Sequence, residues 1–177
     1  MSHQQQLDFI EQLKNQNPEY FSNVKVLEVG SLNINGSIRP FFENCEYLGI
    51  DIGEGKDVDF VSKGEEYNAP DNTFDVTVSC ECFEHNPYWV ETFNNMFRMT
   101  KPLGLIVITC ATTGRAEHGT TRTTPADSPL TLEWDYYKNL TQEDFEKNIN
   151  LDELFEDYAF IHNPTSCDLY FYGMKKC

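Results

Sequence analysis

Five short apolar runs along the chain have the length of buried β-strands. They are residues 24–29, 46–50, 58–61, 74–79 and 105–110. Gly, Asn or Asp lies at one or both ends of most of them, as expected where strands give way to turns. The Lys-Pro-Leu-Gly stretch at 101–104 predicts a turn before the last run, which is the most apolar.

Helical spacing of apolar residues appears in two other places. Leu7, Ile10 and Leu13 predict a short amphipathic helix over residues 5–15. A second helix is expected over residues 87–99, packed against the sheet. The face expected toward the sheet holds Val90, Phe93, Phe97 and either Trp89 or Met96.

A long irregular segment divides these elements from the rest of the chain. Residues 111–137 are rich in Thr, Gly, Pro and Arg and show little periodicity, which is typical of a functional loop. Thr141 with Asp144, and Asn150 with Glu153, then have the spacing of helix-start caps. Two short helices are therefore predicted after the loop.

The order of the elements indicates the fold class. Strands that alternate with helices are typical of an α/β fold with a parallel sheet. Residues 158–174 predict an antiparallel hairpin around an Asn-Pro-Thr-Ser turn. Because 177 residues suit one domain, we expect a helix at 5–15, a core at 24–110, a substrate loop at 111–137 and the terminal hairpin.

The charge of the chain bears on its partners. Twenty-nine acidic residues against 13 basic ones give a formal charge of −16, spread along the whole sequence. Such a surface repels phosphate backbones and anionic lipids, so neither nucleic acid nor membrane is an expected partner. A small molecule is expected instead, and the oligomeric state is left open.

The cysteines bear on the compartment. They lie at positions 45, 80, 82, 110, 167 and 177, mostly beside apolar residues, which favours a reduced protein over a disulfide framework. Cys80 and Cys82 lack a second Cys or His pair at zinc-finger spacing, so no metal site is expected. Without a signal-like segment or an apolar run of membrane-spanning length, the protein is expected in the cytoplasm.

The strongest candidate for chemistry is Val-Leu-Glu-Val-Gly at 26–30, a strand that ends in glycine. Glycine there lets the backbone approach a ligand at the carboxyl edge of a parallel sheet. Asp51 ends the next strand, where a carboxylate can accept hydrogen bonds from both hydroxyls of a ribose. An adenosine-containing cofactor is thus favoured. Leu32 and Asn35 replace two glycines of a dinucleotide loop, which disfavours a nicotinamide cofactor.

Four segments in this order resemble the motifs of class I S-adenosylmethionine-dependent methyltransferases of the type 11 group. They are Val-Leu-Glu-Val-Gly-Ser-Leu-Asn-Ile-Asn-Gly-Ser, Tyr-Leu-Gly-Ile-Asp, Phe-Asp-Val-Thr-Val-Ser-Cys-Glu-Cys-Phe-Glu-His and Lys-Pro-Leu-Gly-Leu-Ile-Val-Ile-Thr, within residues 24–110. The resemblance implies a Rossmann-like, doubly wound sheet of seven strands in the order 3-2-1-4-5-7-6, with an antiparallel last strand. It also implies S-adenosylmethionine as cofactor and S-adenosylhomocysteine as product.

The resemblance assigns cofactor contacts residue by residue. It implies Glu28, Gly30, Ser31 and Leu32 beside the methionine part, Asp51 at the ribose, Ile52 at adenine, and Cys80 and Glu81 at the methionine end. Leu32 departs from the family pattern, since it stands at a second glycine. Lys63 departs as well, because it replaces an Asp that accepts from the adenine amino group. Gly64 or Glu65 would then make the adenine contact.

Candidate groups for the acceptor side lie after the fourth and fifth strands. Transfer of a methyl group from a sulfonium to oxygen or nitrogen needs in-line positioning and a base. His85 and His118 are the candidate bases, with a structural role as the alternative for His85. Arg115 and Arg122 suit an anionic substrate group, with ordinary surface positions as the alternative. The aromatic residues Trp134, Tyr136 and Tyr137 could line a substrate pocket, with core packing as the alternative.

The sequence therefore predicts an enzyme, a methyltransferase acting on oxygen or nitrogen of a small, anionic or sugar-like acceptor. A non-catalytic cofactor-binding or partner-binding module on the same fold is the alternative, because Leu32 and Lys63 weaken the cofactor loop. A nicotinamide-dependent reductase is less favoured. Binding of S-adenosylmethionine or of a nicotinamide dinucleotide, and turnover across acceptors, would discriminate among the three.

Overall fold

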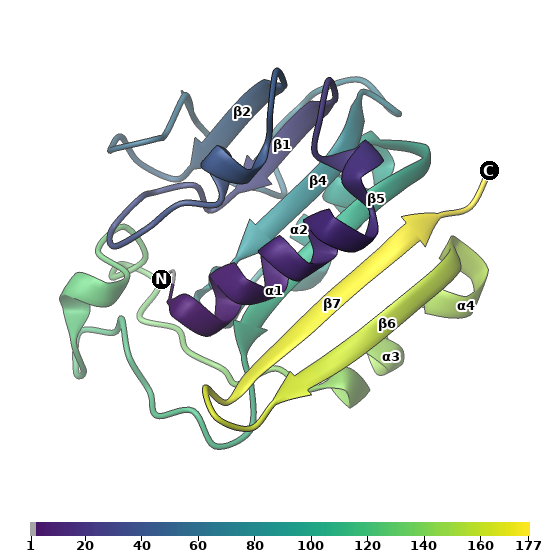
Figure 1. The fold of residues 1–177 in the computed structure, drawn as a ribbon. Coiled ribbons are helices and arrows are strands. Elements are labelled where there is room, and N and C mark those ends of the chain that lie inside the picture. Colours follow the sequence, from purple (N-terminus) through teal and green to yellow (C-terminus); the bar gives the residue numbers. More distant parts are fainter. Residues whose placement is uncertain (1–2) are drawn as a thin grey trace.

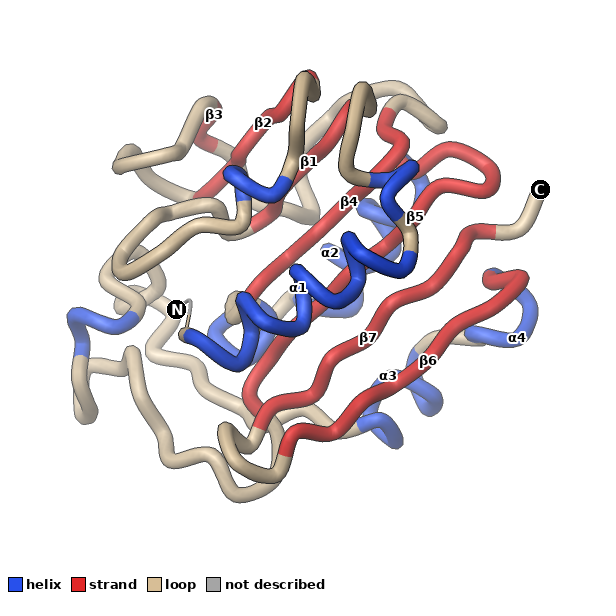
Figure 2. The backbone as a smooth tube through the Cα atoms, viewed as in Figure 1, coloured by secondary structure: helices blue, strands red, loops and turns tan. Residues whose placement is uncertain are grey.

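A seven-stranded sheet forms the centre of the computed structural model, which describes residues 3–177. The strand order is β3-β2-β1-β4-β5-β7-β6 (Figure 1 from β2 onward, with β3 labelled in Figure 2), which confirms the order that the resemblance implies. The strands are β1 (Lys25–Val29), β2 (Glu46–Asp51), β3 (Phe60–Val61), β4 (Phe74–Cys80), β5 (Thr100–Ala111), β6 (Phe155–Asn163) and β7 (Asp168–Lys175). Strands β1 to β5 run parallel, whereas β7 is antiparallel to both β5 and β6.

Four α-helices lie on the two faces of the sheet. They are α1 (Gln4–Gln16), α2 (Trp89–Met99), α3 (Gln142–Asn148) and α4 (Leu151–Leu154). Figure 2 shows α1 on one face, and α2, α3 and α4 on the other. Within residues 3–177 no α-helix joins β1 to β2 or β2 to β3, and only the short 3-10 turn Arg39–Phe41 lies there. The half of the sheet formed by β1, β2 and β3 is thus bordered mainly by loops.

Two apolar cores hold the helices on the sheet. On the side of α2 and α3, Phe93 and Phe145 pack against Phe171 of β7, with ring centroids 6.0 and 6.1 Å from it. On the side of α1, Phe9 stacks on Tyr170 at 4.5 Å. Each such buried side chain contributes about 1.5–3 kcal/mol. Helices and apolar side chains therefore cover both faces of the sheet, and the edges of the sheet are the places where a ligand could reach it.

The start of β5 differs from the prediction. Residues 101–104 do not form a turn before the strand but belong to β5, which begins at Thr100. The pairing with β4 shifts register between Phe74 and Val76, and Leu103 has a positive φ of 60°. A bulge thus absorbs the turn-like residues without ending the ladder, which is why a pattern typical of turns is misleading here.

The buried face of α2 is also displaced from the predicted one. Trp89, Phe93 and Met96 are buried as expected, and Met99 joins them. Val90 and Phe97 are only partly buried and lie at the border of the core. The stripe therefore lies on a slightly different side of the helix from the one that the apolar spacing predicts.

The caps of the two short helices differ in outcome. Thr141 and Asp144 form a full capping box at the start of α3, as predicted. Asn150 precedes α4 but makes no side-chain cap; its amide instead donates to Glu153 at 2.7 Å. The Asn150 side chain therefore contacts Glu153 and does not cap the helix amides.

The topology brings the carboxyl ends of β1, β2, β4 and β5 to one edge of the sheet. The irregular segment between β5 and α3 returns along this edge, with the single 3-10 turn Pro125–Asp127 in it. No helix in the described part of the chain is long and apolar enough to cross a membrane.

Candidate active site

A cavity of about 60 Å³ opens at the carboxyl edge of the sheet. Its walls come from the ends of β1, β2 and β4 and from the loop after β5. The lining residues are Glu28, Gly30, Ser31, Leu32, Ile34, Gly36, Asp51, Cys80, Glu81, Cys82, His85 and residues 127–131. Most of the cofactor contacts that the resemblance implies are among them.

A second cavity of about 20 Å³ adjoins the first. The two share Gly30, Asp51, Cys82 and Thr131. The other walls of the smaller cavity are Val29, Ile52, Ser62, Gly64, Glu65, Asn86 and Trp134. The three remaining predicted contacts, all on the adenine side, thus lie here, and the structure brings all ten into one crevice.

Gly30 allows β1 and β4 to approach each other closely. Its φ is +82°, and a Cβ atom at this position would lie 2.6 Å from Sγ of Cys82. A side chain there would meet both a backbone that L-residues rarely adopt and a direct clash. The glycine that the sequence singles out is therefore required by the geometry of the crevice itself.

Asp51 is held at the end of β2 by two backbone amides. Its Oδ2 accepts from the amide of Leu32 at 2.9 Å and its Oδ1 from the amide of Ile52 at 2.8 Å. Burial raises the pKa of this carboxyl, and the two amides oppose that shift. Each oxygen keeps a further lone pair for a ligand. Leu32 thus contributes its backbone, which a residue other than glycine can do equally well.

Glu28 is a buried carboxyl in the wall of the larger cavity. Its side chain accepts from the hydroxyl of Tyr47 at 2.9 Å, and the residue is only 4% exposed. Burial raises its pKa to about 8, since that hydrogen bond offsets only part of the desolvation. A cation in the cavity would favour the charged form.

Lys63 lies outside both cavities. Its ammonium is 2.8 Å from Glu66 on the surface, and it is absent from either lining. Glu65, in contrast, lines the smaller cavity and accepts from Thr92 at 3.2 Å. The departure at Lys63 therefore leaves the adenine side with Glu65 and the backbone of Gly64.

The loop after β5 closes over the crevice. Residues 127–131 line the larger cavity and Trp134 the smaller one. Leu130 lies against the backbone of Gly53, where an added Cβ would be 2.8 Å from its Cδ2. Sites for small molecules usually measure about 300–1,000 Å³, so the described conformation is closed. The sequence indicates that this segment is functional and that Trp134 could line a pocket, but without periodicity it does not indicate residues 127–131.

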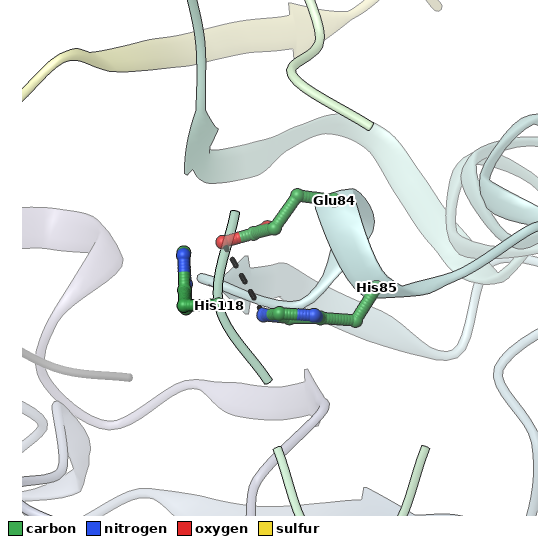
Figure 3. Close-up of side chains that lie close together, drawn as sticks. All are labelled: Glu84, His85 and His118. Atoms are coloured by element: carbon green, nitrogen blue, oxygen red, sulfur yellow. Dashed lines mark ion pairs between the residues drawn. The ribbon is translucent and has the colours of Figure 1, made fainter. Parts of the chain in front are cut away.

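Both candidate bases belong to one buried cluster with Glu84 (Figure 3). Glu84 and His85 lie in the 3-10 turn after β4, and His118 comes from the loop after β5. The two imidazole centroids are 5.0 Å apart, and His85 Nε2 is 4.0 Å from Glu84 Oε1. Sequence spacing identifies the two histidines separately, whereas their contact and the part of Glu84 appear only in the fold.

The protonation of the cluster follows from its burial. Glu84, His85 and His118 are 0, 2 and 8% exposed. Burial, together with the neighbouring His118, lowers the pKa of His85 to about 3. Burial also lowers the pKa of His118 and raises that of the Glu84 carboxyl. Both imidazoles are therefore neutral near pH 7 and able to accept a proton or a metal ion.

Tyr137 is placed beside these histidines. Its ring centroid is 5.5 Å from that of His85 and 5.0 Å from that of His118. The hydroxyl donates to the carbonyl of Ala116 at 3.2 Å, and Nδ1 of His118 lies 3.1 Å from the same oxygen. Tyr137 thus supports the cluster, although it does not line either cavity.

The two arginines of the loop are already paired with protein groups. Arg115 donates to the carbonyl of Ser166 and lies 3.4 Å from Asp168. Arg122 pairs with Glu117 and Asp135 at the surface. Neither arginine lines the larger or the smaller cavity described above. To bind an anionic substrate, they would have to exchange these carboxylates for it.

The cysteines near the crevice are thiols. All six cysteines are free, and Cys80 is buried at the end of β4. Burial raises the pKa of both Cys80 and Cys82 well above the usual range, so neither is a thiolate near neutral pH. They are walls of the cavity and not nucleophiles.

Residues 27–108 match the family model described as a methyltransferase domain. The matched segment runs from β1 into β5 and includes Gly30 and Asp51. Among curated proteins, none matches the chain in sequence. The family match thus covers the strands that build the crevice and stops before the loop that closes it.

Solved structures similar to this chain include three methyltransferases. The CurJ carbon methyltransferase has a TM-score of 0.65 and 14% identity, over 97% of this chain and 54% of its own. The 1,6-didemethyltoxoflavin-N1-methyltransferase of Burkholderia thailandensis, solved with S-adenosylhomocysteine, has a TM-score of 0.66 and 14% identity, over 97% of this chain and 79% of its own. Phosphoethanolamine N-methyltransferase 2 of Haemonchus contortus, also solved with S-adenosylhomocysteine, has a TM-score of 0.62 and 16% identity, over 92% of this chain and 53% of its own. This chain spans about half the length of the first and third, and identities this low establish the fold alone.

Proposed function

We propose that this chain, which carries a methyltransferase domain on the class I methyltransferase fold, is an S-adenosylmethionine-dependent methyltransferase acting on oxygen or nitrogen of a small polar acceptor. The observation that carries the proposal is the convergence of all ten implied cofactor contacts on two adjoining cavities. They lie at the carboxyl edge of the sheet, where open α/β folds bind ligands.

The crevice suits this cofactor in its chemistry. S-adenosylmethionine, when bound, supplies a methyl group on a positively charged sulfur, and it also carries an ammonium group. Glu28 and Asp51 offer carboxylates to such a ligand, and Gly30 keeps the backbone free of a side chain beside it. Asp51 would accept from the ribose, and Glu65 with the backbone of Gly64 would face adenine.

The acceptor would meet the cluster of Glu84, His85 and His118. His85 reaches the wall of the larger cavity, beside Cys82 and residues 127–131. Both imidazoles are neutral, so each has a lone pair for the proton that an acceptor hydroxyl or amine loses, but burial lowers the pKa of both and makes them weaker bases than a free histidine. His118 does not line either cavity, but the Ala116 carbonyl holds its Nδ1 and leaves Nε2 without a hydrogen-bond partner in the described residues.

The charge of the walls favours an uncharged, sugar-like acceptor over an anionic one. Asp51 and Asp127 line the larger cavity and would repel an anion. Arg115 and Arg122, the residues suited to an anion, are engaged elsewhere. An anionic acceptor is the alternative, and a screen that contains both classes separates them.

Calorimetric titration with S-adenosylmethionine and S-adenosylhomocysteine tests the proposal. We expect micromolar binding of both by the wild type and affinity about tenfold or more weaker in Asp51→Ala, which loses the ribose acceptor. Asp71→Ala is the matched control, because Asp71 is exposed and pairs only with Arg98 on the surface. Circular dichroism of each variant verifies that the fold persists.

Two outcomes would contradict the proposal. Binding of a nicotinamide dinucleotide in place of S-adenosylmethionine would favour a reductase. Tight binding of S-adenosylmethionine without transfer of a labelled methyl group to any sugar, polyol, amine or anion would favour a non-catalytic binding module. Transfer to a member of one class identifies the acceptor chemistry.

A further inference from the structure

We propose that Glu84, His85 and His118 form a binding site for one divalent first-row transition-metal ion, such as Mn²⁺, Fe²⁺ or Zn²⁺, at the edge of the larger cavity (Figure 3). The sequence predicts no metal site from Cys80 and Cys82, and the ligands proposed here meet only in the folded chain. Metal binding itself does not depend on the proposed methyl transfer, whereas the role of the ion in catalysis rests on it.

The spacing of the three side chains suits a single ion. One ligand atom from each lies within 4.8 Å of the other two. Two ligands bound to one ion at about 2.1 Å are at most about 4.2 Å apart. Small side-chain rotations would therefore close the cluster around the ion without any movement of the backbone.

The cluster contains buried polar atoms that a metal ion would satisfy. Both carboxylate oxygens of Glu84, both ring nitrogens of His85 and Nε2 of His118 are buried without a hydrogen-bond partner in the described chain. Buried polar groups nearly always have hydrogen-bond partners, because a buried donor or acceptor without one costs about 1–3 kcal/mol. Five such atoms at one place indicate a missing partner with several coordination positions.

His118 is already oriented as metal-binding histidines are. Its Nδ1 lies 3.1 Å from the carbonyl oxygen of Ala116, which fixes the tautomer with the proton on Nδ1. The lone pair of Nε2 is then free for a metal. Tyr137 donates to the same carbonyl oxygen and packs against both rings, so the ligand is held from two sides.

Gly119 shows that the loop is built to bring the two histidines together. Its φ is +63°, and a Cβ there would lie 2.7 Å from Cε1 of His85. Any other residue at this position would push the loop, and with it His118, away from His85. Gly119 thus allows the loop to hold the imidazole of His118 next to that of His85.

The ligand set selects the class of metal. Two imidazoles with one carboxylate are the donors that Fe²⁺, Mn²⁺ and Zn²⁺ accept, and three protein ligands leave coordination positions open. Mg²⁺ and Ca²⁺ prefer oxygen ligands, and Cu⁺ prefers sulfur. Because His85 also lines the larger cavity, the open positions would adjoin the space for the acceptor.

An ion here would change how the acceptor is activated. Nitrogens that bind a metal cannot also take a proton, so the two histidines would serve as ligands and the ion as a Lewis acid. The acceptor hydroxyl would lose its proton to water, and its oxygen would form the new bond to the methyl carbon. The sulfur–methyl bond would break with its electron pair left on sulfur, which yields S-adenosylhomocysteine.

Metal titration of the whole chain tests the site. After removal of bound ions with a chelator, Co²⁺ is added as the probe and followed by visible absorption, with Zn²⁺ as competitor. We expect one equivalent to bind in the wild type and affinity at least about tenfold lower in Glu84→Gln, His85→Ala and His118→Ala. His162→Ala is the matched control, since His162 is exposed on β6 and away from the cluster.

Stoichiometric binding that the three variants weaken and His162→Ala leaves unchanged would establish the site. Absence of stoichiometric binding to a folded wild type, or equal affinity in all variants, would overturn it. Glu84→Gln keeps the shape of the side chain, so its near-ultraviolet spectrum distinguishes loss of a ligand from loss of the fold. Titration of the metal-free protein with S-adenosylmethionine reports on the proposed function separately, since those contacts do not include the three ligands.

Discussion

A single buried carboxyl at the end of β1 links the stability of the fold to the chemistry of the crevice. Glu28 is 4% exposed and its hydroxyl partner, Tyr47, is itself held in β2. Desolvation favours the protonated form, so the pKa of Glu28 is about 8 in the folded chain against an ordinary value of 4.5. The residue is thus neutral in the ligand-free fold at the pH where its charge would serve a cationic ligand.

We expect this carboxyl to make stability fall as pH rises. Between about pH 4.5 and 8 the folded state keeps the proton of Glu28 while the unfolded state has lost it. The free energy of unfolding therefore decreases with increasing pH through this window. Glu28→Gln keeps the acceptor for Tyr47 but cannot ionise, so it should be more stable than the wild type by about 2 kcal/mol or more at pH 8 and similar to it at pH 4.5.

Urea unfolding of both proteins across pH 4.5–8.5 measures this difference. Tyr47→Phe is a useful companion, because it removes the hydroxyl that opposes the pKa shift of Glu28 and should extend the fall in stability to higher pH. Parallel curves for the wild type and Glu28→Gln would show that the carboxyl is ionised in the folded chain after all.

At the scale of elements, the loop between β5 and α3 decides access to the crevice. Residues 127–131 and Trp134 occupy space that a ligand as large as S-adenosylmethionine needs, and the two cavities together are far below the usual size of such sites. The strands around them are fixed by their ladders. We therefore expect the loop to move when the cofactor binds.

Tryptophan fluorescence can follow that movement. Trp134 lines the smaller cavity, whereas Trp89, the other tryptophan, is 5% exposed in the core under α2. We expect S-adenosylhomocysteine to shift the emission of the wild type and of Trp89→Phe, and to leave that of Trp134→Phe unchanged. A shift that persists in Trp134→Phe would place the movement elsewhere.

The elements also show how far the sequence could predict the fold and the site. The sequence predicts the places of Gly30 and Asp51, because Gly30 directly follows β1 and Asp51 ends β2 within a recognisable motif. Glu84 was not, because nothing in its local spacing shows that a loop residue more than thirty positions later, His118, packs beside it. The same holds for Leu130, whose segment has no periodicity and is ordered by tertiary contacts.

At the scale of the whole molecule, charge is the dominant surface property. The formal charge is −16, and most of the ion pairs join side chains that are partly exposed. Such pairs contribute little, so mutual repulsion among the unpaired carboxylates opposes folding. Salt shortens the range of this repulsion, to about 10 Å at 0.1 M and about 3 Å at 1 M.

Thermal unfolding at increasing sodium chloride concentration tests this balance. We expect the Tm to rise by about 2–4 °C between 0.02 and 0.5 M, which corresponds to about 1 kcal/mol for a chain of this size. Chloride is preferred to sulfate, since sulfate stabilises most proteins by exclusion from their surface. A Tm that falls with salt would mean that attractive pairs outweigh the repulsion.

One loop borders both the cofactor cavities and the metal-ligand cluster, since His118 and Gly119 lie near its start and Trp134 near its end. We therefore expect that a cofactor which displaces Trp134 also shifts His118 and Gly119, which lie at the metal-ligand cluster. For the proposed methyl transfer we therefore expect an order of addition: cofactor first, acceptor second, and the methylated product leaving before the spent cofactor. The steady-state pattern expected from such an order is that S-adenosylhomocysteine competes only with S-adenosylmethionine.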